Sequence, residues 1–322
     1  MKVLIAPLNW GLGHATRCIP IIHRYLEQGD EVVLAGDGDS LQLLKRRFPE
    51  LRTIDLPSLE LRYTTNTQQR GFYFRAIWLL LRFTIADYYY LQKILSIEHF
   101  DLVISDNRFG LFSSSTHSVY ITHQLYPILP KRLRIFQSLA RMLHACIYKR
   151  YDEVWVPDYS NLCQNLSGAL SHGGCFDQHA KYIGPLSRFS LTISGSTLNA
   201  NQRNAKYSVL AILSGLEPQR TMFEQQILQR FLSVSDNVLL IRGKIGEPHT
   251  IIHKGNITIM PSISDDEMIS AAEHASTIIA RSGYSTIMDL EVLGMLHKAE
   301  LHPTPGQSEQ EYLAKLHQVL YM

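Results

Sequence analysis

Residues 2–36 read KVLIAPLNWGLGHATRCIPIIHRYLEQGDEVVLAG, and this stretch decides the fold. Residues 2–8 form an apolar run of strand length, and residues 31–35 form a second one. Between them lie a glycine-punctuated turn and, over residues 15–28, apolar side chains at helical spacing. A strand, a helix and a strand in this order pair in parallel through a right-handed crossover. We therefore expect a βαβ unit that starts a doubly wound α/β sheet.

Two domains are expected from the length of 322 residues, which exceeds what one hydrophobic core usually holds. Strand-like runs alternate with helical stretches as far as residue 156, and they resume at residue 208. Residues 187–206 are rich in Ser, Thr and Asn and lack helical periodicity, so we interpret them as a linker. The predicted domains are therefore residues 1–186 and residues 207–322. Two such sheets facing each other would form a ligand cleft at the carboxyl ends of their strands.

The composition excludes several functional classes. A net charge of +2 does not favour nucleic acid as a partner. Four cysteines without a CxxC pair exclude a zinc ribbon and a disulfide scaffold, and they indicate a reducing compartment. The first apolar run is too short for the core of a signal peptide, and the longest one, residues 76–81, is too short to span a bilayer. We therefore expect a cytoplasmic protein.

The first candidate loop, residues 11–17, reads GLGHATR and follows the first strand. Its glycines allow close backbone approach, and the helix that follows offers free N–H groups to an anion. A dinucleotide site would need a third glycine where Thr16 stands, although Asp37 after the second strand could bind a ribose. His14 at the tip of this loop could accept a proton near neutral pH. A plain βα turn is the alternative.

The second candidate loop follows the strand at residues 277–280 and reads RSGYST at residues 281–286. Ser and Gly at a helix start leave amide donors directed beyond the strand, where the helix dipole favours phosphate. Asp289 interrupts the apolar helix that follows and could bind the diol of a ribose. An exposed acid on a surface face is the alternative for Asp289.

Two further loops also follow strands of the second domain. Residues 303–311 read PTPGQSEQE, and their amides and carboxylates could bind sugar hydroxyls. A helix capping box of Ser308 with Glu311 explains part of this pattern equally well. Residues 214–220 read SGLEPQR and end in an arginine suited to phosphate.

Three weaker patterns carry no firm assignment. Asp37-Gly38-Asp39 matches a DxD metal motif, but a turn explains it as well. Residues 172–179 hold two histidines, a cysteine and an aspartate without the spacing of a tetrahedral metal site, so we interpret them as a loop. Residues 105–108, SDNR, close a strand and are expected to line the cleft, without an assigned role.

Taken together, these loops resemble glycosyltransferase family 28, which includes the N-acetylglucosaminyltransferase of peptidoglycan-precursor synthesis. The resemblance rests on GLGHATR (11–17), SGLEPQR (214–220), RSGYSTIMDL (281–290) and PTPGQSEQEY (303–312). It covers both halves of the chain in order, and the last two segments are its specific part. It implies a GT-B fold, in which two Rossmann-like domains face each other across a cleft and the second holds a nucleotide-sugar.

The resemblance also implies a role for each motif residue. His14 would be the catalytic base, and Asp289 would bind the ribose. The residues implied for the donor nucleotide and its phosphates are Gly11, Gly13, Ser214, Gly215, Arg220, Arg281, Ser282, Gly283 and Asp289. Those implied for the donor sugar are Gly306, Gln307, Glu309 and Gln310. The implied enzyme is a hexosyltransferase that uses a UDP-sugar as substrate, needs no metal and no cofactor, and inverts the anomeric carbon.

Two other functions stay open at this point. A nucleotide-sugar hydrolase of the same fold would use His14 to activate water, because G-x-G-H-x-x-R also resembles the loop of such enzymes. A binder of nucleotide-sugars without activity is the third possibility.

A last pattern concerns the acceptor. Residues 131–150 carry six basic and no acidic side chains, beside apolar residues at helical spacing. A second apolar stretch, residues 72–95, contains Trp78 and three consecutive tyrosines. Packing of both stretches into the domain core is the simpler expectation. The alternative is peripheral docking at the inner face of an anionic membrane, where a lipid-linked or glycolipid acceptor would be reached.

Overall fold

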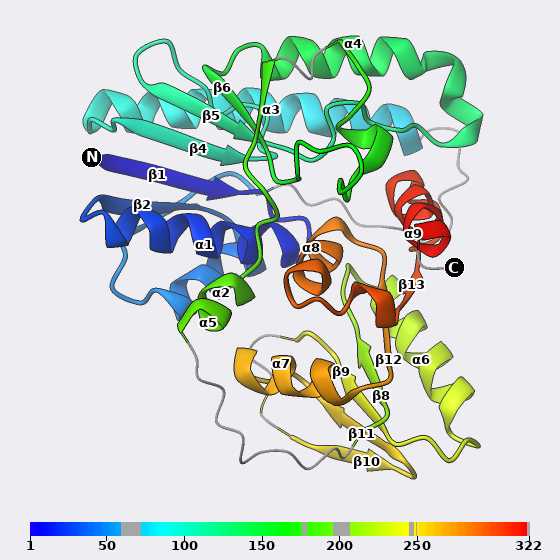
Figure 1. Ribbon diagram of the computed structural model, residues 1–322. Helices are drawn as coiled ribbons and strands as arrows, with labels where there is room; N and C mark the ends of the chain where they lie inside the picture. The colour runs from blue at the N-terminus through cyan, green and yellow to red at the C-terminus, as the bar shows by residue number, and fades with distance from the viewer. Residues whose placement is uncertain (59–71, 176–178, 196–206, 245–247, 249, 321–322) are drawn as a thin grey trace. The chain divides into compact units, whose positions relative to one another are not determined.

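The computed structural model contains two compact units, Met1–Leu186 and Ser187–Met322 (Figure 1). The residues that the structure describes are 1–58, 72–175, 179–195, 207–244, 248 and 250–320. Each unit is built on its own sheet, and parallel pairs dominate both sheets. The predicted α/β class with two doubly wound sheets is therefore confirmed.

The first unit holds a seven-stranded parallel sheet in the order β3-β2-β1-β4-β5-β6-β7. Its strands are β1 (Lys2–Pro7), β2 (Glu31–Gly36), β3 (Thr53–Asp55), β4 (Leu102–Asp106), β5 (His117–Ile121), β6 (Glu153–Val156) and β7 (Ala180–Tyr182). Its helices are α1 (Gly13–Glu27), α2 (Gly38–Arg47), α3 (Phe72–Ile97), η1 (Lys131–Phe136), α4 (Gln137–Tyr148) and η2 (Gly168–Leu170). The predicted βαβ unit is thus formed by β1, α1 and β2.

β1 is apolar because both faces of the sheet are covered. Leu4 and Ala6 pack with Leu91 of α3 on one face. Val3 and Ile5 alternate with them and are also fully buried, and α1 contacts β1 and β2. β1 pairs with β2 on one side and with β4 on the other, so the strand order reverses there. Doubly wound sheets bind ligands at the carboxyl end of such a switch point.

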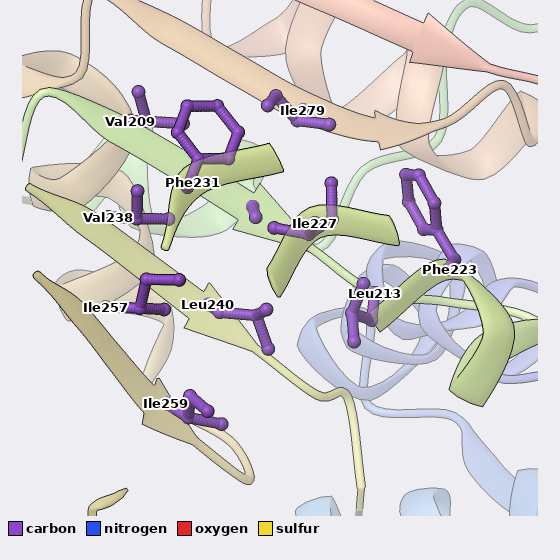
Figure 2. Packing of buried hydrophobic residues seen from close by; sticks show 11 residues of the cluster. Val209, Leu213, Phe223, Ile227, Phe231, Val238, Leu240, Ile257, Ile259 and Ile279 are labelled. Atoms are coloured by element: carbon purple, nitrogen blue, oxygen red, sulfur yellow. The ribbon is translucent and has the colours of Figure 1, made fainter. Parts of the chain in front are cut away.

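The second unit holds a six-stranded sheet in the order β10-β11-β9-β8-β12-β13. Its strands are β8 (Val209–Ile212), β9 (Val238–Ile241), β10 (Ile252–Lys254), β11 (Ile257–Met260), β12 (Thr277–Arg281) and β13 (Ala299–His302). Its helices are α5 (Phe189–Gly195), α6 (Gln219–Phe231), α7 (Asp265–His274), α8 (Tyr284–Val292), η5 (Leu296–Lys298) and α9 (Ser308–Leu320). All pairs are parallel except the β10–β11 hairpin. Phe223, Ile227 and Phe231 of α6 pack over the central strands (Figure 2).

β13 is more polar than a parallel strand with two covered faces, and its position explains this. It is the last strand of its sheet and pairs only with β12. Leu301 faces the core and is buried, whereas Glu300 forms ion pairs with Arg230 of α6 and with His302. The polar side chains of β13 therefore form ion pairs and hydrogen bonds at the edge of the sheet, with each other and with α6.

The predicted linker spans residues 187–206. Its first part, residues 187–195, belongs to the second unit instead. Phe189–Gly195 forms α5, which contacts α7 and α8, and both Ser187 and Phe189 are buried. The prediction missed this helix because its short, Ser- and Thr-rich sequence lacks apolar periodicity, so tertiary contacts stabilise it. Residues 196–206 lie outside the described part of the chain.

Candidate active site

His14 and Asp106 lie together at the carboxyl edge of the first sheet. His14 is in the first turn of α1, after the glycine loop that follows β1, and Asp106 ends β4. β1 and β4 are neighbours, with Pro7 opposite Asp106, so parallel pairing brings the loop and the carboxylate to one edge. The distance from Nδ1 of His14 to Oδ1 of Asp106 is 3.2 Å. In the tautomer in which Nδ1 carries the proton and donates it to Asp106, Nε2 is free to act as a base.

Arg17 joins both residues from one turn further along α1. Its Nε donates to Oδ2 of Asp106 at 2.7 Å, and its Nη2 donates to Oδ1 of the same carboxylate. Nη2 also lies 2.9 Å from Nδ1 of His14, and Nη1 lies 3.2 Å from Nδ1 of His123. Arg17 and Asp106 are almost completely buried, whereas the His14 side chain is 15% exposed. His14 is therefore more accessible than either of its two charged neighbours.

The electrostatics of this cluster leave His14 neutral and Asp106 charged. Burial and then the charge of Arg17 lower the pKa of His14, against a weaker opposite effect of Asp106. Burial alone would raise the pKa of Asp106, but the charge of Arg17, together with the interaction with His14, holds this pKa well below its usual range. At neutral pH the imidazole can therefore accept a proton while a carboxylate stands beside it.

The glycine loop itself suits close approach by another molecule. Gly11 has a φ of +80°, which favours glycine, and a Cβ added there would meet nothing within 4 Å. No side chain caps the start of α1 at Gly13, because the N-cap residue is Leu12. The uncapped N–H groups of this turn are consistent with the anion site that the sequence predicts.

Asp37 has a role different from the two that the sequence suggests for it. Its Oδ1 accepts a hydrogen bond from Nη1 of Arg108 at 2.7 Å, and Arg108 also pairs with Asp87 of α3. All three are buried, so the Asp37 carboxylate is bound within the unit and not available to a ribose or a metal. His172 is also buried, and its ring stacks on Tyr182. Across the described ranges, no group of His, Cys, Asp and Glu side chains could hold a metal ion.

Three predicted donor loops meet in the second unit because β12 pairs with β8 on one side and with β13 on the other. Nη1 of Arg281 donates to the main-chain oxygen of Pro303 at 2.9 Å, and Nη2 donates to that of Gln219 at 3.1 Å. The hydroxyl of Ser282 donates to the main-chain oxygen of Gln310 at 2.8 Å. The segments 214–219, 281–283 and 303–310 therefore form one surface of loops at the carboxyl edge of this sheet.

The start of α8 has the features expected of a phosphate site. Gly283 is its N-cap residue, and no side chain caps the helix. A Cβ added at Gly283 would meet nothing within 4 Å, so space for a ligand exists beside the first N–H groups.

Asp289 is not the exposed surface acid that the sequence left open. It accepts a hydrogen bond from the hydroxyl of Ser187 at 2.6 Å and is half-buried. Burial raises the pKa of Asp289 to about 6, and the charge of Arg188 opposes this rise. Because burial disfavours the charged form, keeping this carboxylate ionised costs free energy of folding. A strong hydrogen-bonding partner would offset that cost, and a ribose diol is one such partner.

Other predicted donor residues have partners within their own loops. Arg220 pairs with Glu217 at 2.8 Å, which partly neutralises its charge. Oε1 of Gln310 accepts a hydrogen bond from the main-chain N–H of Thr304 at 2.8 Å, which fixes this side chain against its own loop. Gly215 and Gly306 have φ values of +97° and +83°, and both turns therefore favour glycine. The roles of Ser214, Gln307 and Glu309 stay predictions.

Asp106 and Arg17 belong to the site, although the sequence pattern assigns neither of them a role. Residues 105–108 are predicted to line a cleft without a role, and Asp106 now pairs with His14. One signal was present in the sequence: an arginine three residues after a histidine on a helix lies on the same face.

Proteins of known class resemble this chain over nearly its whole length. An uncharacterized glycosyltransferase of Methanosarcina acetivorans is 24% identical over 335 residues, which cover 97% of this chain and 82% of the relative. A second one from the same organism is 27% identical over 169 residues, 49% of this chain and 42% of the relative. No protein-family model matches the chain.

Solved structures of glycosyltransferases have a fold similar to that of this chain. A spinosyn rhamnosyltransferase superposes with a TM-score of 0.61 at 10% identity, covering 97% of this chain and 84% of its own. The calicheamicin glycosyltransferase CalG4 has a TM-score of 0.59 at 14% identity, with coverages of 99% and 88%. The fold is that of the GT-B glycosyltransferases. The predicted enzyme class, a glycosyltransferase, is confirmed, whereas family 28 and the peptidoglycan resemblance stay predictions.

Proposed function

We propose that the protein is a metal-independent, inverting glycosyltransferase that moves a sugar from a UDP-sugar to a sugar or glycolipid acceptor. The observation that carries the proposal is the contact between Nδ1 of His14 and the buried carboxylate of Asp106 at the switch point of the first sheet. One similar structure is described as Phytolacca americana UGT2 complexed with UDP-2-fluoro-glucose, which supports UDP as the donor nucleotide, whereas the spinosyn rhamnosyltransferase is described in complex with thymidine diphosphate.

In the proposed reaction, Nε2 of His14 takes the proton of the acceptor hydroxyl. The acceptor oxygen then forms a bond to the anomeric carbon from the face opposite the nucleotide. The bond from that carbon to the diphosphate oxygen breaks, and its electron pair leaves with UDP. Asp106 stabilises the imidazolium that forms. For the second unit, we propose that the N-terminus of α8 binds the diphosphate of the donor.

The test is incubation of the purified protein with a panel of UDP-sugars, with and without sugar and glycolipid acceptors. Acceptor-dependent release of UDP supports the proposal. Rapid release of free sugar without any acceptor would instead identify a hydrolase, in which His14 activates water. Binding of UDP without turnover under all conditions would identify a non-catalytic binder.

We further propose that the acceptor is reached at the inner face of an anionic membrane. The apolar residues of η1 and α4 do not all pack into the core, contrary to the simpler expectation. The exposed ones lie at helical spacing and are Ile135, Phe136, Leu139, Met142 and Leu143. The exposed charged residues of the same segment are all basic: Lys131, Arg132, Arg134, Lys149 and Arg150. Such a helix is typical of a membrane interface.

α3 adds a second surface of the same kind. Trp78, Leu81, Ile85 and Tyr89 are at least half exposed and recur along one face of the helix. Arg82 lies over the Trp78 ring at 4.7 Å. Within the described part of the chain, no helix is long and apolar enough to cross a bilayer. Peripheral docking through α3 and α4 would explain why this apolar area is exposed.

Co-sedimentation with vesicles containing anionic lipid tests this docking. Binding should fall steeply as salt rises, because each basic residue near such a surface contributes about 1 kcal/mol and is screened within a Debye length. Replacing Arg132 and Arg134 by Glu should lower binding at least about tenfold. Lys254→Glu, on the exposed β10 of the second unit, is the matched control. Failure to bind vesicles of any charge at low salt would favour a soluble sugar acceptor.

A further inference from the structure

The turn Asp37-Gly38-Asp39 begins α2, but its first aspartate does not cap this helix. Asp37 is the N-cap residue, and an aspartate there usually accepts a hydrogen bond from an N–H group of the first turn. Within the described ranges, the Asp37 side chain makes no such bond. Its Oδ1 accepts from Nη1 of Arg108 at 2.7 Å instead, and its Oδ2 accepts from Nδ2 of Asn9 at 3.2 Å. Asn9 belongs to the loop that connects β1 to α1, shortly before His14.

Asn9 caps α2 in place of Asp37. Its Oδ1 accepts a hydrogen bond at 3.3 Å from the main-chain N–H of Ser40, which lies in the first turn of α2. A carboxylate only accepts hydrogen bonds and an N–H group only donates them, so a single orientation of the Asn9 amide satisfies both partners. Asn9 therefore joins the glycine loop to the start of α2 through both polar atoms of its side chain.

Two further features at the start of α2 fit this connection. Gly38 has a φ of +53°, and a Cβ added there would collide with Nδ2 of Asn9. The hydroxyl of Ser40 is buried and lies 3.4 and 3.3 Å from the main-chain oxygens of Leu8 and Gly11. The start of α2 therefore contacts the glycine loop at residues 8, 9 and 11.

The partners of the glycine loop are themselves held in place. Arg108 is fully buried, and besides Asp37 it binds both carboxylate oxygens of Asp87 in α3, at 2.7 and 3.1 Å. On the other side of the loop, the N–H of Leu8 donates to the main-chain oxygen of Asp106 at 2.9 Å. The loop is thus held at the carboxyl ends of both β2 and β4, the two neighbours of β1. These contacts determine where α1 begins.

We propose that Asn9 is a positioning residue for His14. Glycine-containing loops have many accessible backbone conformations, and the bonds of Asn9 to Asp37 and Ser40 restrict this loop to one of them. That conformation keeps Nδ1 of His14 within reach of Asp106. The inference rests on the proposed function, in which His14 is the base. It goes further by assigning to the turn at Asp37 the task of holding that base in place.

Kinetics and calorimetry of the full-length protein test the inference. Asn9→Ala should lower kcat about 10- to 100-fold, because a misplacement of about 1 Å in an active site can cost about 10²-fold. The affinity for UDP should not change, because in the proposed function the second unit binds the nucleotide. Asp39→Ala is the matched control, since Asp39 is exposed in the same turn and should change neither quantity. An equal loss of kcat and UDP affinity in Asn9→Ala would indicate general damage and overturn the inference.

An exchange of the two side chains tests the contact itself. Asn9→Asp places a second carboxylate against Asp37 and should lower kcat at least as much as Asn9→Ala does. In the variant that carries both Asn9→Asp and Asp37→Asn, the amide and the carboxylate change places. The amide at position 37 can then donate to position 9 while its oxygen accepts from Arg108. This double variant should recover most of the lost kcat, and a failure to recover it would contradict the inference.

The titration of the His14 imidazole gives a readout that does not depend on turnover. Burial is the largest cause that lowers the pKa of His14, so a loosened loop should raise this pKa toward its usual value of about 6.5. NMR of the imidazole signals, assigned with His14→Gln, should show this rise in Asn9→Ala and not in Asp39→Ala. If Asn9→Ala does not fold, Ser40→Ala should show the same rise, because it removes only the hydroxyl that contacts the loop.

The titration also separates this inference from the proposed function. An unchanged pKa of His14 in the folded variants would overturn the inference, whether or not the protein transfers a sugar. A raised pKa together with an unchanged kcat would support the positioning of His14 and would contradict its role as the base.

Discussion

Replacing Asp289 by Asn should stabilise the ligand-free protein at pH 8 and weaken its binding of UDP. The carboxylate of Asp289 accepts a hydrogen bond from Ser187, and an asparagine oxygen can accept the same bond. The substitution therefore removes the charge and leaves the packing nearly unchanged. A gain in stability together with a loss of affinity would show that this charge serves a ligand and not the fold.

The sign follows from the raised pKa of Asp289, about 6 in the folded protein. The folded state holds this proton more tightly than the unfolded state does, so ionisation costs stability. The cost is absent below about pH 4, grows between about pH 4 and 6, and is complete above that range. About two pKa units correspond to about 3 kcal/mol, and partial solvent exposure reduces this to about 1–2 kcal/mol. Asparagine carries no charge, so the variant does not lose this stability. The melting temperature of Asp289→Asn should therefore be about 3–6 °C above that of wild type at pH 8.

Thermal melts of wild type and Asp289→Asn at pH 4.5 and pH 8 measure this difference. The variant should melt higher at pH 8 and nearly level with wild type at pH 4.5. Asp266→Asn is the control, because Asp266 is exposed in the first turn of α7, and its loss should lower stability slightly. Calorimetry should show UDP binding weaker by about 1–3 kcal/mol. A difference in melting temperature that is the same at both pH values would refute the reasoning.

The remaining predictions concern the chemistry of the first unit. His14→Ala should lower kcat about 10²- to 10⁴-fold with UDP affinity unchanged, and an unchanged kcat would remove His14 as the base. Asp106→Asn should also lower kcat without weakening UDP binding, because it removes the carboxylate that stabilises the imidazolium. Circular dichroism should confirm that this variant folds, since Arg17 loses its partner. Turnover should survive EDTA, and its loss with rescue by Mn²⁺ would contradict the metal-independent mechanism.

The strands and the first βαβ unit could be predicted because their signals are local. Residues 2–8 and 31–35 are continuous apolar runs, as expected of parallel strands with both faces covered. The glycine turn and helical spacing between them leave few alternatives. The two sheets and the division near residue 186 follow from repetition of the same pattern.

The pairings inside the site could not be predicted, because they depend on which strands become neighbours. His14 and Asp106 are 92 residues apart and meet only because β1 pairs with β4. Asp37 is 71 residues from Arg108 in the sequence. Nothing in the turn Asp37-Gly38-Asp39 indicates that the Asp37 carboxylate forms an ion pair with this arginine. The exposure of Ile135 was also unexpected, because an apolar stripe has the same sequence whether it is covered or not.

The bond between Ser187 and Asp289 has a practical consequence for dissecting the molecule. A fragment that starts at residue 207 would omit Ser187 and Phe189, and with them the helix that contacts α7 and α8. Asp289 would then be left without its hydroxyl partner. A fragment that starts at residue 187 retains every one of these contacts and is expected to fold autonomously. Nucleotide recognition could therefore be studied by NMR on a chain of less than half the full length, provided that the cut is placed before this serine.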